Sequence, residues 1–449
     1  MNAETRDRQG HLERSLGLWA VVLFGLAYMT PMIVYGTFGV LAEISHGMVP
    51  TAYVLALGAV LLTAVSYGKM AYIFPVAGSA YTYARKSIGS NIGFMVGWAV
   101  LLDYFFLPMV IWLIGAAYLG EAFPGVPTQV WLIGFIFVTT VINIIGIAFA
   151  SKVNFMLMMM QSLIVAAFIL LCIYYVGASQ GAGGLISARP FFNPDVSFSF
   201  AFAGAAIAAY SFLGFDAVTT LTEETIDPKR NMPRAIFLIA LIGGAIFVTA
   251  AYFAQLAHPE TSFENVSAAA FLIAAKIGGD VFAAIFLIGL VVAQFASGLA
   301  AQTSVGRLLY AMGRDSVLPK SVFGYIHPRF NTPVYNLILA SLVGLMALYL
   351  DVATSTSFIN FGAFLAFTFV NLSVISLVLK KHEAMRDTGV LTGLVVPALG
   401  AVFNLYLLIS LDGRAITLGC VWLALGAVYL AYLTRGFSRR PPEVSFAEA

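Results

Sequence analysis

The sequence contains very little charge. Only 10% of its 449 residues are Asp, Glu, Lys or Arg, whereas 61% are hydrophobic. A soluble chain carries about 25% charged residues, so this composition excludes an ordinary soluble domain and indicates an integral membrane protein. The 23 basic and 21 acidic residues nearly balance, which gives no reason to expect a nucleic-acid partner. The lipid bilayer is the first partner that the composition predicts.

Cysteine and histidine are scarce as well. Cys172 and Cys420 both lie in apolar runs, and their spacing matches neither a metal site nor a disulfide framework. The five histidines fall outside the apolar runs, so we interpret them as loop residues. This pattern argues against a metal centre and against a histidine proton relay within the membrane.

Three further features are missing. No Gly-x-x-x-x-Gly-Lys loop occurs, so a P-loop nucleotide motor is not expected. No nucleophile–base set lies within the apolar runs, so we expect neither a membrane-embedded enzyme nor a cofactor. The stretches between the runs are too short to fold as soluble domains. The start of the chain, residues 1–16, is too charged for a cleavable signal peptide.

Long apolar runs are abundant. A transmembrane helix needs about 20 predominantly apolar residues, and we count twelve such runs. They predict an all-α integral membrane protein with twelve transmembrane helices. The predicted spans are 17–42, 50–74, 93–120, 128–149, 153–177, 199–224, 234–256, 279–311, 333–350, 356–379, 389–411 and 414–435.

The distribution of basic residues supports this count. Twelve spans place both termini on one side of the membrane. If that side is the cytoplasm, all but three of the 23 basic residues fall inside. Only Arg189, Lys276 and Arg414 fall outside, as the positive-inside rule requires. We therefore predict that both termini are cytoplasmic.

Two of the spans are interrupted. In the first span, Pro31 is followed by two glycines within eight residues, and proline removes a backbone donor, so we predict irregular backbone near 35–39. In the sixth span a Leu-Gly pair predicts an opening near 212–215. The two breaks lie five spans apart, so the second unit enters the membrane in the opposite sense. Paired broken helices of this kind indicate a transporter binding site.

Carboxylates near these breaks are the first candidates for chemistry. Asp103 lies about ten residues into the third span, roughly 15 Å deep. A charge at that depth is costly and by default marks function. Asp103 could bind an ammonium group or carry a proton, or it could be a neutral or hydrogen-bonded residue that packs against an adjacent helix. Asp216 could accept an ammonium or cap the next half-helix. Glu223 and Glu224 lie about 10–12 Å further on. We predict that one of them is a gate or a helix-end ion-pair residue, whereas the other could face the site, and both are candidates for proton coupling or gating.

Aromatic, glycine and hydroxyl residues complete the predicted site. An aromatic face attracts an ammonium by roughly 1–2 kcal/mol when desolvated, although packing explains each aromatic alone better than ligand binding does. Polar residues of spans eight and ten could line the site or form interhelical hydrogen bonds. The predicted substrate ligands beside the two aspartates are Tyr35, Gly36, Thr37, Gly39, Tyr104, Tyr210, Phe212, Gly214 and Phe215. The predicted polar lining is Gln294, Ser297, Ser304, Asn360, Thr368 and Asn371.

Several stretches resemble one known family. The segment after the second span reads FPVAGSAYTYARKSIGSNIGFMVGW (74–98). It is similar to the Pro-x-Ala-Gly-x-x-Tyr-x-Tyr and Gly-Phe-x-x-Gly-Trp motifs of the amino acid–polyamine–organocation permeases. The segment EETIDPKRNMPRAI (223–236) resembles the loop after that family's sixth helix. The resemblance extends in order to about residue 380.

Within that family, four stretches resemble the bacterial putrescine importers. They are LLDYFFLPM (101–109), FLGFDAVTTLTEET (212–225), ASGLAAQTSVGRLLYAMGRD (296–315) and INFGAFLAFTFVNLSV (359–374). The resemblance implies a LeuT-like five-plus-five inverted repeat with two extra C-terminal helices, in a bacterial inner membrane. It also implies a central site between helices 1, 3, 6, 8 and 10, and uptake driven by an ion gradient, usually of protons and less often of sodium.

These implications give the predicted organisation of the chain. Its parts are a cytoplasmic tail (1–16), a first repeat (17–177), an extracellular loop (178–198), a second repeat (199–380), helices 11 and 12 (381–435) and a cytoplasmic tail (436–449).

Two positions depart from the family pattern. The putrescine importers carry an aspartate in helix 1 where this chain has Gly36. Some proton-coupled members carry a lysine in helix 5 where Gln161 stands here. If this protein uses protons, the titrating group should therefore be a carboxylate.

The predicted function is import of a small organic amine or polyamine, putrescine-like, in symport with protons by alternating access. The alternative is a proton-coupled amino-acid permease, because Gly36 leaves room for a substrate carboxylate. A rival from another class is a membrane sensor or channel that binds an amine without transport. Polarity concentrated at two breaks favours a transporter over a channel.

Overall fold

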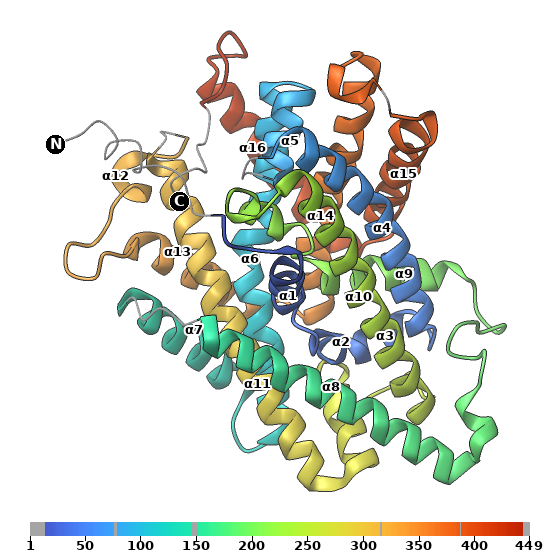
Figure 1. Ribbon diagram of the computed structural model, residues 1–449. Helices are drawn as coiled ribbons and strands as arrows, with labels where there is room; N and C mark the ends of the chain where they lie inside the picture. The colour runs from blue at the N-terminus through green and yellow to red at the C-terminus, as the bar shows by residue number, and fades with distance from the viewer. Residues whose placement is uncertain (1–13, 76–78, 146–150, 315–316, 387, 443–449) are drawn as a thin grey trace.

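The computed structural model describes residues 14–75, 79–145, 151–314, 317–386 and 388–442 (Figure 1). Within these ranges every regular element is a helix, and the extended backbone pairs at one parallel bridge, between Leu16 and Thr225. Eleven helices are long and apolar enough to cross a membrane. The prediction of an all-α membrane protein is therefore confirmed.

The helices follow one another in this order: α1 (Leu18–Met29), α2 (Ile33–Gly36), α3 (Phe38–Ile44), α4 (Val49–Ile73), α5 (Ser79–Ser87), α6 (Ser90–Ala122), α7 (Thr128–Ile145), α8 (Ser151–Gln180), η2 (Ala182–Leu185), α9 (Ser199–Ala208), η3 (Ala209–Phe212), η4 (Ala217–Glu224), α10 (Pro228–Ala257), η5 (Val266–Ala268), α11 (Ala269–Arg314), α12 (Lys320–Phe323), α13 (Val334–Gly344), η6 (Leu345–Leu348), α14 (Val352–Leu379), η7 (Glu383–Met385), η8 (Leu391–Val395), α15 (Val396–Ile409) and α16 (Gly413–Leu433).

The helix bounds agree closely with the predicted spans, with one shortfall. The third span, predicted at 93–120, is the longer helix α6. Helix α11 has non-helical backbone at Gly279 (φ 68°), where the eighth span was predicted to begin. The ninth span, predicted at 333–350, is a shorter apolar helix, Val334–Leu348. Eleven spans are confirmed by length and composition, and the count of twelve stays a prediction.

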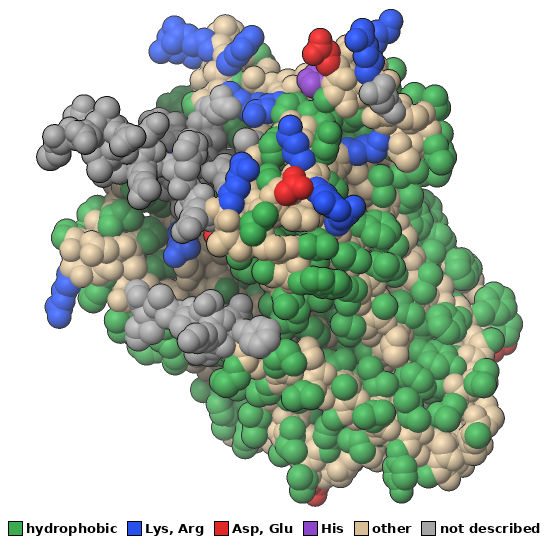
Figure 2. All heavy atoms as spheres, viewed as in Figure 1, with side chains coloured by type: hydrophobic (Ala, Val, Ile, Leu, Met, Phe, Trp, Pro, Cys, Tyr) green, Lys and Arg blue, Asp and Glu red, His purple; other side chains and the backbone are tan. Residues whose placement is uncertain are grey.

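The surface divides into an apolar flank and a basic end. Figure 2 shows hydrophobic side chains over the flanks and lower part of the molecule, whereas Lys and Arg gather at the upper end. Large apolar side chains on α7, α8 and α16 are exposed, among them Phe137, Leu163 and Val428. Exposed apolar area on this scale indicates contact with lipid.

Helix packing forms two groups. Helix α10 packs against α4 and α1, and α4 also packs against α9. In the other group, α6 packs against α11 and α7, and α13 packs against α11 and α7. Helix α1 lies in the middle of the bundle (Figure 1). The first and sixth spans therefore share one group and face the other.

The first span breaks earlier than predicted. Helix α1 ends at Met29, Thr30 has φ 53°, and helix resumes at Ile33. The residue before a proline is disfavoured in helical conformation, and proline cannot donate a hydrogen bond, so Pro31 places the break directly beside itself. A second interruption lies within the predicted opening at 35–39, at Thr37 (φ −116°, ψ 2°), between the end of α2 and the start of α3. The prediction is therefore confirmed there, but it missed the break beside Pro31.

The second break is where the sequence predicted it. Helical structure ends at Phe212, Leu213 is extended (ψ 131°), Gly214 has φ 102°, and η4 begins after Asp216. A Cβ atom on Gly214 would lie 2.1 Å from Cδ1 of Tyr28. The two breaks therefore contact each other, and only glycine fits at this contact.

Replacing Gly214 by alanine tests this contact. Gly214→Ala forces a side chain into left-handed backbone and against Tyr28, so we expect a loss of about 1–3 kcal/mol in stability. The measurement is thermal unfolding of the detergent-solubilised protein. Gly177→Ala in α8 is the matched control, because its Cβ would meet nothing within 4 Å. Equal melting temperatures for the two variants would contradict the packing described here.

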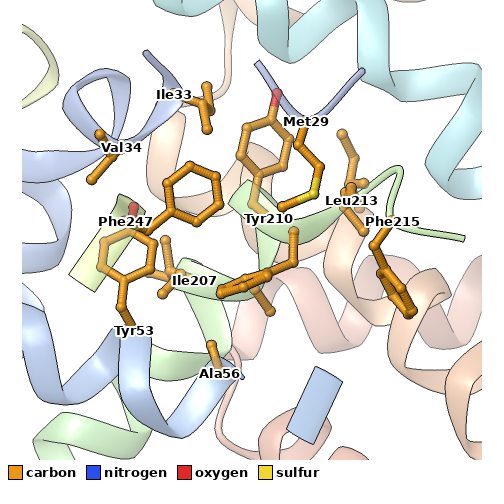
Figure 3. Packing of buried hydrophobic residues seen from close by; sticks show 14 of the residues in the cluster. Met29, Ile33, Val34, Tyr53, Ala56, Ile207, Tyr210, Leu213, Phe215 and Phe247 are labelled. Atoms are coloured by element: carbon orange, nitrogen blue, oxygen red, sulfur yellow. The ribbon is translucent and has the colours of Figure 1, made fainter. Parts of the chain in front are cut away.

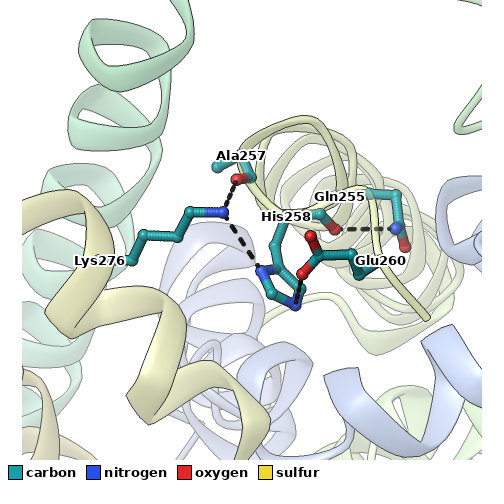
Figure 4. A network of polar contacts seen from close by, with 5 residues as sticks. All are labelled: Gln255, Ala257, His258, Glu260 and Lys276. Atoms are coloured by element: carbon teal, nitrogen blue, oxygen red, sulfur yellow. Dashed lines mark hydrogen bonds and ion pairs between the residues drawn. The ribbon is translucent and has the colours of Figure 1, made fainter. Parts of the chain in front are cut away.

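A polar network joins the end of α10 to the beginning of α11 (Figure 4). The Lys276 ammonium lies 3.2 Å from the Ala257 carbonyl oxygen and 3.5 Å from His258 Nδ1. On the other side of the ring, His258 Nε2 lies 3.4 Å from Glu260 Oε2. Partial burial, and then the Lys276 charge, lower the pKa of His258, while Glu260 opposes this shift. The folded state therefore favours neutral imidazole.

This network predicts an acid-sensitive contact. An unfolded histidine titrates near pH 6.5, and a folded-state pKa below that value makes folding less favourable as the pH falls through this range. We expect His258→Gln to reduce the loss of thermal stability between pH 7.5 and pH 5.5. His46→Gln is the control, since that ring contacts Phe200. An unchanged pH dependence in His258→Gln would contradict this assignment.

Candidate functional site

A cavity of about 220 Å³ lies between the two broken spans and helices α6, α8 and α11. Its wall is mostly apolar, with hydroxyl and amide groups at a few positions. The lining residues are Phe24, Ala27, Tyr28, Met29, Thr30, Ile33, Leu107, Ile111, Leu157, Gln161, Tyr210, Leu213, Ala293, Gln294, Ala296, Ser297, Ala300, Ala301 and Ser304.

The cavity is elongated along α11. Its lining runs on that helix from Ala293 to Ser304, a distance of about 16 Å at 1.5 Å per residue. On the first span it runs from Ile33 back to Phe24. The cavity therefore reaches from the first-span break toward the end of the bundle at which α1 begins.

Asp103 is not among the residues that line the cavity, but it shares a face of α6 with two of them and has an unused oxygen. It lies one helical turn before Leu107 and two turns before Ile111, on the cavity face of α6. It is close enough to interact electrostatically with Tyr28 and Tyr210, which both line the cavity. Its Oδ1 atom is buried and accepts no hydrogen bond from any described residue. No described residue of an adjacent helix donates a hydrogen bond to this atom, and the alternative of a neutral packing carboxyl stays a prediction.

Gln161 supplies a second unused acceptor. Its side chain is buried and lines the cavity, and its Oε1 atom has no hydrogen-bond partner among the described residues. Buried polar atoms are normally paired, so two unpaired acceptors around one cavity indicate a site for a donor ligand. Sequence reasoning identified Gln161 as a family departure but did not place it in the site. The sequence feature that could have placed Gln161 in the site is that it is a single amide side chain in an apolar span.

Asp216 is already held by hydroxyl groups. Its Oδ2 atom accepts hydrogen bonds from the Tyr67 hydroxyl (3.0 Å) and the Ser79 hydroxyl (3.2 Å). Its side chain makes no capping bond to η4, so the capping interpretation was wrong. Asp216 instead ties the second break to α4 and to the start of α5. It does not line the cavity, but it interacts electrostatically with Asp103.

The aromatic groups near the second break divide between the cavity wall and the hydrophobic core, part of which Figure 3 shows. Tyr210 lies beside Met29, and both line the cavity. Phe212 packs on Phe247 with ring centroids 5.3 Å apart, and Phe215 packs on Tyr67 at 5.5 Å. The structure therefore places Phe212 and Phe215 in the hydrophobic core, where packing explains them. Tyr28, which the sequence reasoning missed, takes their place at the cavity.

The predicted ligands Tyr35 and Thr37 lie beyond the break. Tyr35 is fully buried and stacks on Phe168 with centroids 4.1 Å apart, and its carbonyl accepts the Tyr118 hydroxyl at 2.5 Å. The Thr37 hydroxyl donates to the Ile33 carbonyl at 3.4 Å. Neither residue lines the cavity. Tyr104 is half-buried beside Asp103 and interacts with it electrostatically.

The two glycines of the first span have different surroundings. A Cβ on Gly39 would lie 2.1 Å from the Val266 carbonyl oxygen, so close helix packing explains that glycine. A Cβ on Gly36 would lie 3.3 Å from Ile114 and 3.7 Å from the Gln294 amide nitrogen. Of these two glycines, Gly36 is therefore the one that lies near a cavity-lining polar group.

The end of the sixth span contacts the start of the chain. The Glu224 carbonyl accepts hydrogen bonds from the backbone of Ser15 and Leu16, both at 3.0 Å. No described residue forms an ion pair with Glu224. The side chain of Glu223 lies outside the described residues. The gating role of this pair stays a prediction.

The polar residues of spans eight and ten separate clearly. Gln294, Ser297 and Ser304 line the cavity, as predicted. Asn360 donates to the Ala206 carbonyl at 2.7 Å, and Asn371 donates to Thr63 at 3.1 Å. These amides, together with Thr368, whose hydroxyl donates to the backbone at 2.7 Å, form interhelical or intrahelical bonds and do not line the cavity.

With this geometry in view, the chain can be compared with known proteins. The model of the family described as "Amino acid permease" matches residues 20–430. The chain belongs to the amino acid permease family. This permease is 42% identical over 446 residues to the low-affinity putrescine importer PlaP of Escherichia coli K12, covering 98% of each chain.

More distant relatives of this permease are described with other substrates. It is 26% identical to the branched-chain amino acid permease BcaP of Bacillus subtilis, covering 95% of this chain and 94% of the relative. It is also 26% identical to the methylthioribose transporter of Bacillus subtilis, covering 96% and 95%. The resemblance to this family, including its putrescine importers, is confirmed.

The bonds to Asp216 predict unequal effects of two neighbouring tyrosines. Tyr67→Phe removes a donor to a buried carboxylate and should cost about 1–3 kcal/mol of stability. Tyr83→Phe is the matched control, since the rings lie 5.9 Å apart and the Tyr83 hydroxyl has no described partner. Thermal unfolding of the two variants in one detergent checks this. Equal losses would show that the Tyr67 bond contributes nothing particular.

Proposed function

We propose that this permease imports a small organic amine or polyamine, such as putrescine, in symport with protons by alternating access. The similarity to a putrescine importer over nearly the whole chain supports the substrate class. The basic residues support an orientation with both termini in the cytoplasm of a bacterial cell, across its inner membrane.

The unpaired Oδ1 atom of Asp103 carries the proposal. A carboxylate in a low-dielectric environment is stable only when it binds a proton or pairs with a cation. Either an ammonium group or a proton satisfies Asp103, and the two exclude each other. Binding of the amine therefore displaces the proton from Asp103. Symport requires that this proton stay on the protein, on a second carboxyl such as Asp216, whose charge interacts with that of Asp103, so that amine and proton cross the membrane together.

The remaining cavity residues suit a small cation. A volume of about 220 Å³ lies below the range of about 300–1,000 Å³ typical of drug-sized ligands. Tyr28 and Tyr210 offer aromatic faces that favour an ammonium. The Gln161 Oε1 acceptor can bind a second amino group of a diamine, with Gln294 and Ser297 as further polar contacts.

The pattern of helix contacts supports an inverted repeat. The first span packs against the seventh through α1 and α10, and the sixth packs against the second through η3 and α4. Likewise α7 packs against α11, and α13 packs against α6. Each contact recurs when both span numbers shift by five, as two five-span repeats require. Alternating access then follows from rocking of the group formed by spans 1, 2, 6 and 7.

Amino-acid transport is the alternative that Gly36 favours. The backbone beside Gly36 is uncharged and adjacent to Gln294, so a substrate carboxylate would meet no repulsion there. The alignment with the branched-chain amino acid permease covers 95% of this chain and 94% of that relative.

Counterflow in proteoliposomes separates these functions. Proteoliposomes that contain the purified protein are loaded with unlabelled putrescine, or with one of a panel of amino acids. Uptake of the labelled compound is then followed with and without an inward proton gradient. Exchange of putrescine that accelerates with the gradient supports the proposal. Exchange of amino acids alone supports the alternative, and the absence of any exchange rejects transport of these compounds.

Asp103 is the residue on which this function depends. Asp103→Asn keeps the shape of the side chain but removes the charge, so we expect putrescine uptake to fall at least about tenfold and its dependence on the proton gradient to disappear. Asp195→Asn, in an exposed loop, is the control of equal charge change and should leave uptake unaltered. Undiminished uptake by Asp103→Asn would reject the site while leaving the transport class intact.

A further inference from the structure

A second, larger cleft lies away from the cavity, where α4 ends and α10 begins. Its volume is about 840 Å³, and it is walled by these two helices and by the segment around Met385. Both helices are membrane spans, so their ends lie at the membrane–water boundary. The described lining contains four cationic side chains, Lys69, Lys229, Arg230 and Arg234, and one carboxylate, Asp227.

The cationic side chains of this cleft have few interactions with other described residues. Lys69 donates to the Thr392 hydroxyl at 3.1 Å, and the Lys229 ammonium lies 5.9 Å from the Tyr72 ring centroid. Arg230 and Arg234 are exposed and lie one turn apart on α10, and neither forms an ion pair with a described residue. Two guanidinium groups spaced in this way match the oxygens of a phosphodiester.

The floor of the cleft is apolar and leads into the lipid-facing surface. Val65, Pro233 and Phe237 are among its lining residues. Phe237 is partly exposed, and Leu241, one turn further along α10, is exposed too. A soluble anion would leave this apolar floor uncovered, whereas a lipid acyl chain would cover it. The cleft therefore joins a cationic rim to an apolar track along a membrane span.

We propose that this cleft binds an anionic glycerophospholipid. Its phosphodiester would contact Arg230 and Arg234, with Lys229 at the rim, and one acyl chain would lie along Phe237 and Leu241. The positive end of the α10 dipole adds to the attraction. Basic pockets between spans, with an apolar continuation, are the arrangement that recognises acidic lipid headgroups.

Native mass spectrometry of the purified full-length protein tests this site. The protein in detergent is titrated with phosphatidylglycerol or with phosphatidylcholine of the same chain length. We expect phosphatidylglycerol to be retained at concentrations at least about tenfold lower. The variant Arg230→Gln/Arg234→Gln should lose this preference, and Arg439→Gln/Arg440→Gln, an equal charge change in an exposed segment near the C-terminus, should keep it.

Three outcomes would overturn the proposal. One is retention of phosphatidylglycerol that is equal in both double variants. Another is the absence of any preference over phosphatidylcholine. The third is full displacement of the lipid by millimolar inorganic phosphate, which would identify a site for a soluble anion instead. Should the double variant fail to fold, Lys229→Gln, at an exposed position, tests the same cleft. None of these readouts depends on transport.

Discussion

Every polar group in an apolar helix bundle needs a hydrogen-bond partner, and this requirement organises the structure. Most groups meet it locally: Asp216 receives two hydroxyl donors, and Asn371 is bonded to Thr63. Asp103 and Gln161 lie on two helices that wall one cavity, and each has a buried acceptor left unpaired among the described residues. A ligand or a proton that bound there would remove the cost of these unpaired acceptors.

The broken helices make that cavity possible. Pro31 and Gly214 interrupt two spans at matching depths, and the interruptions touch through Tyr28 and Gly214. A continuous helix would fill this space with side chains on a fixed period. The breaks instead let Tyr28 and Tyr210 turn toward α6, α8 and α11.

Sequence reasoning predicted the helical class, eleven of the spans and the second break, because each follows from local composition or from one residue's chemistry. It found the interruption at Thr37 but missed the earlier one beside Pro31, because it weighted the glycines over the proline. It could not tell Phe212, which packs on Phe247, from Tyr210, which lines the cavity. That distinction depends on the rotation of a 3₁₀ turn. Nor could it assign donors to Asp216, since Tyr67 and Ser79 come from distant parts of the chain.

The bridge between Leu16 and Thr225 has a mechanical consequence. Together with the bonds from Ser15 and Leu16 to the Glu224 carbonyl, it clamps the entrance of the first span to the exit of the sixth. Under the proposed alternating access, we therefore expect these two segments to move together relative to α11, so that the first and sixth spans change the width of the cavity as one body.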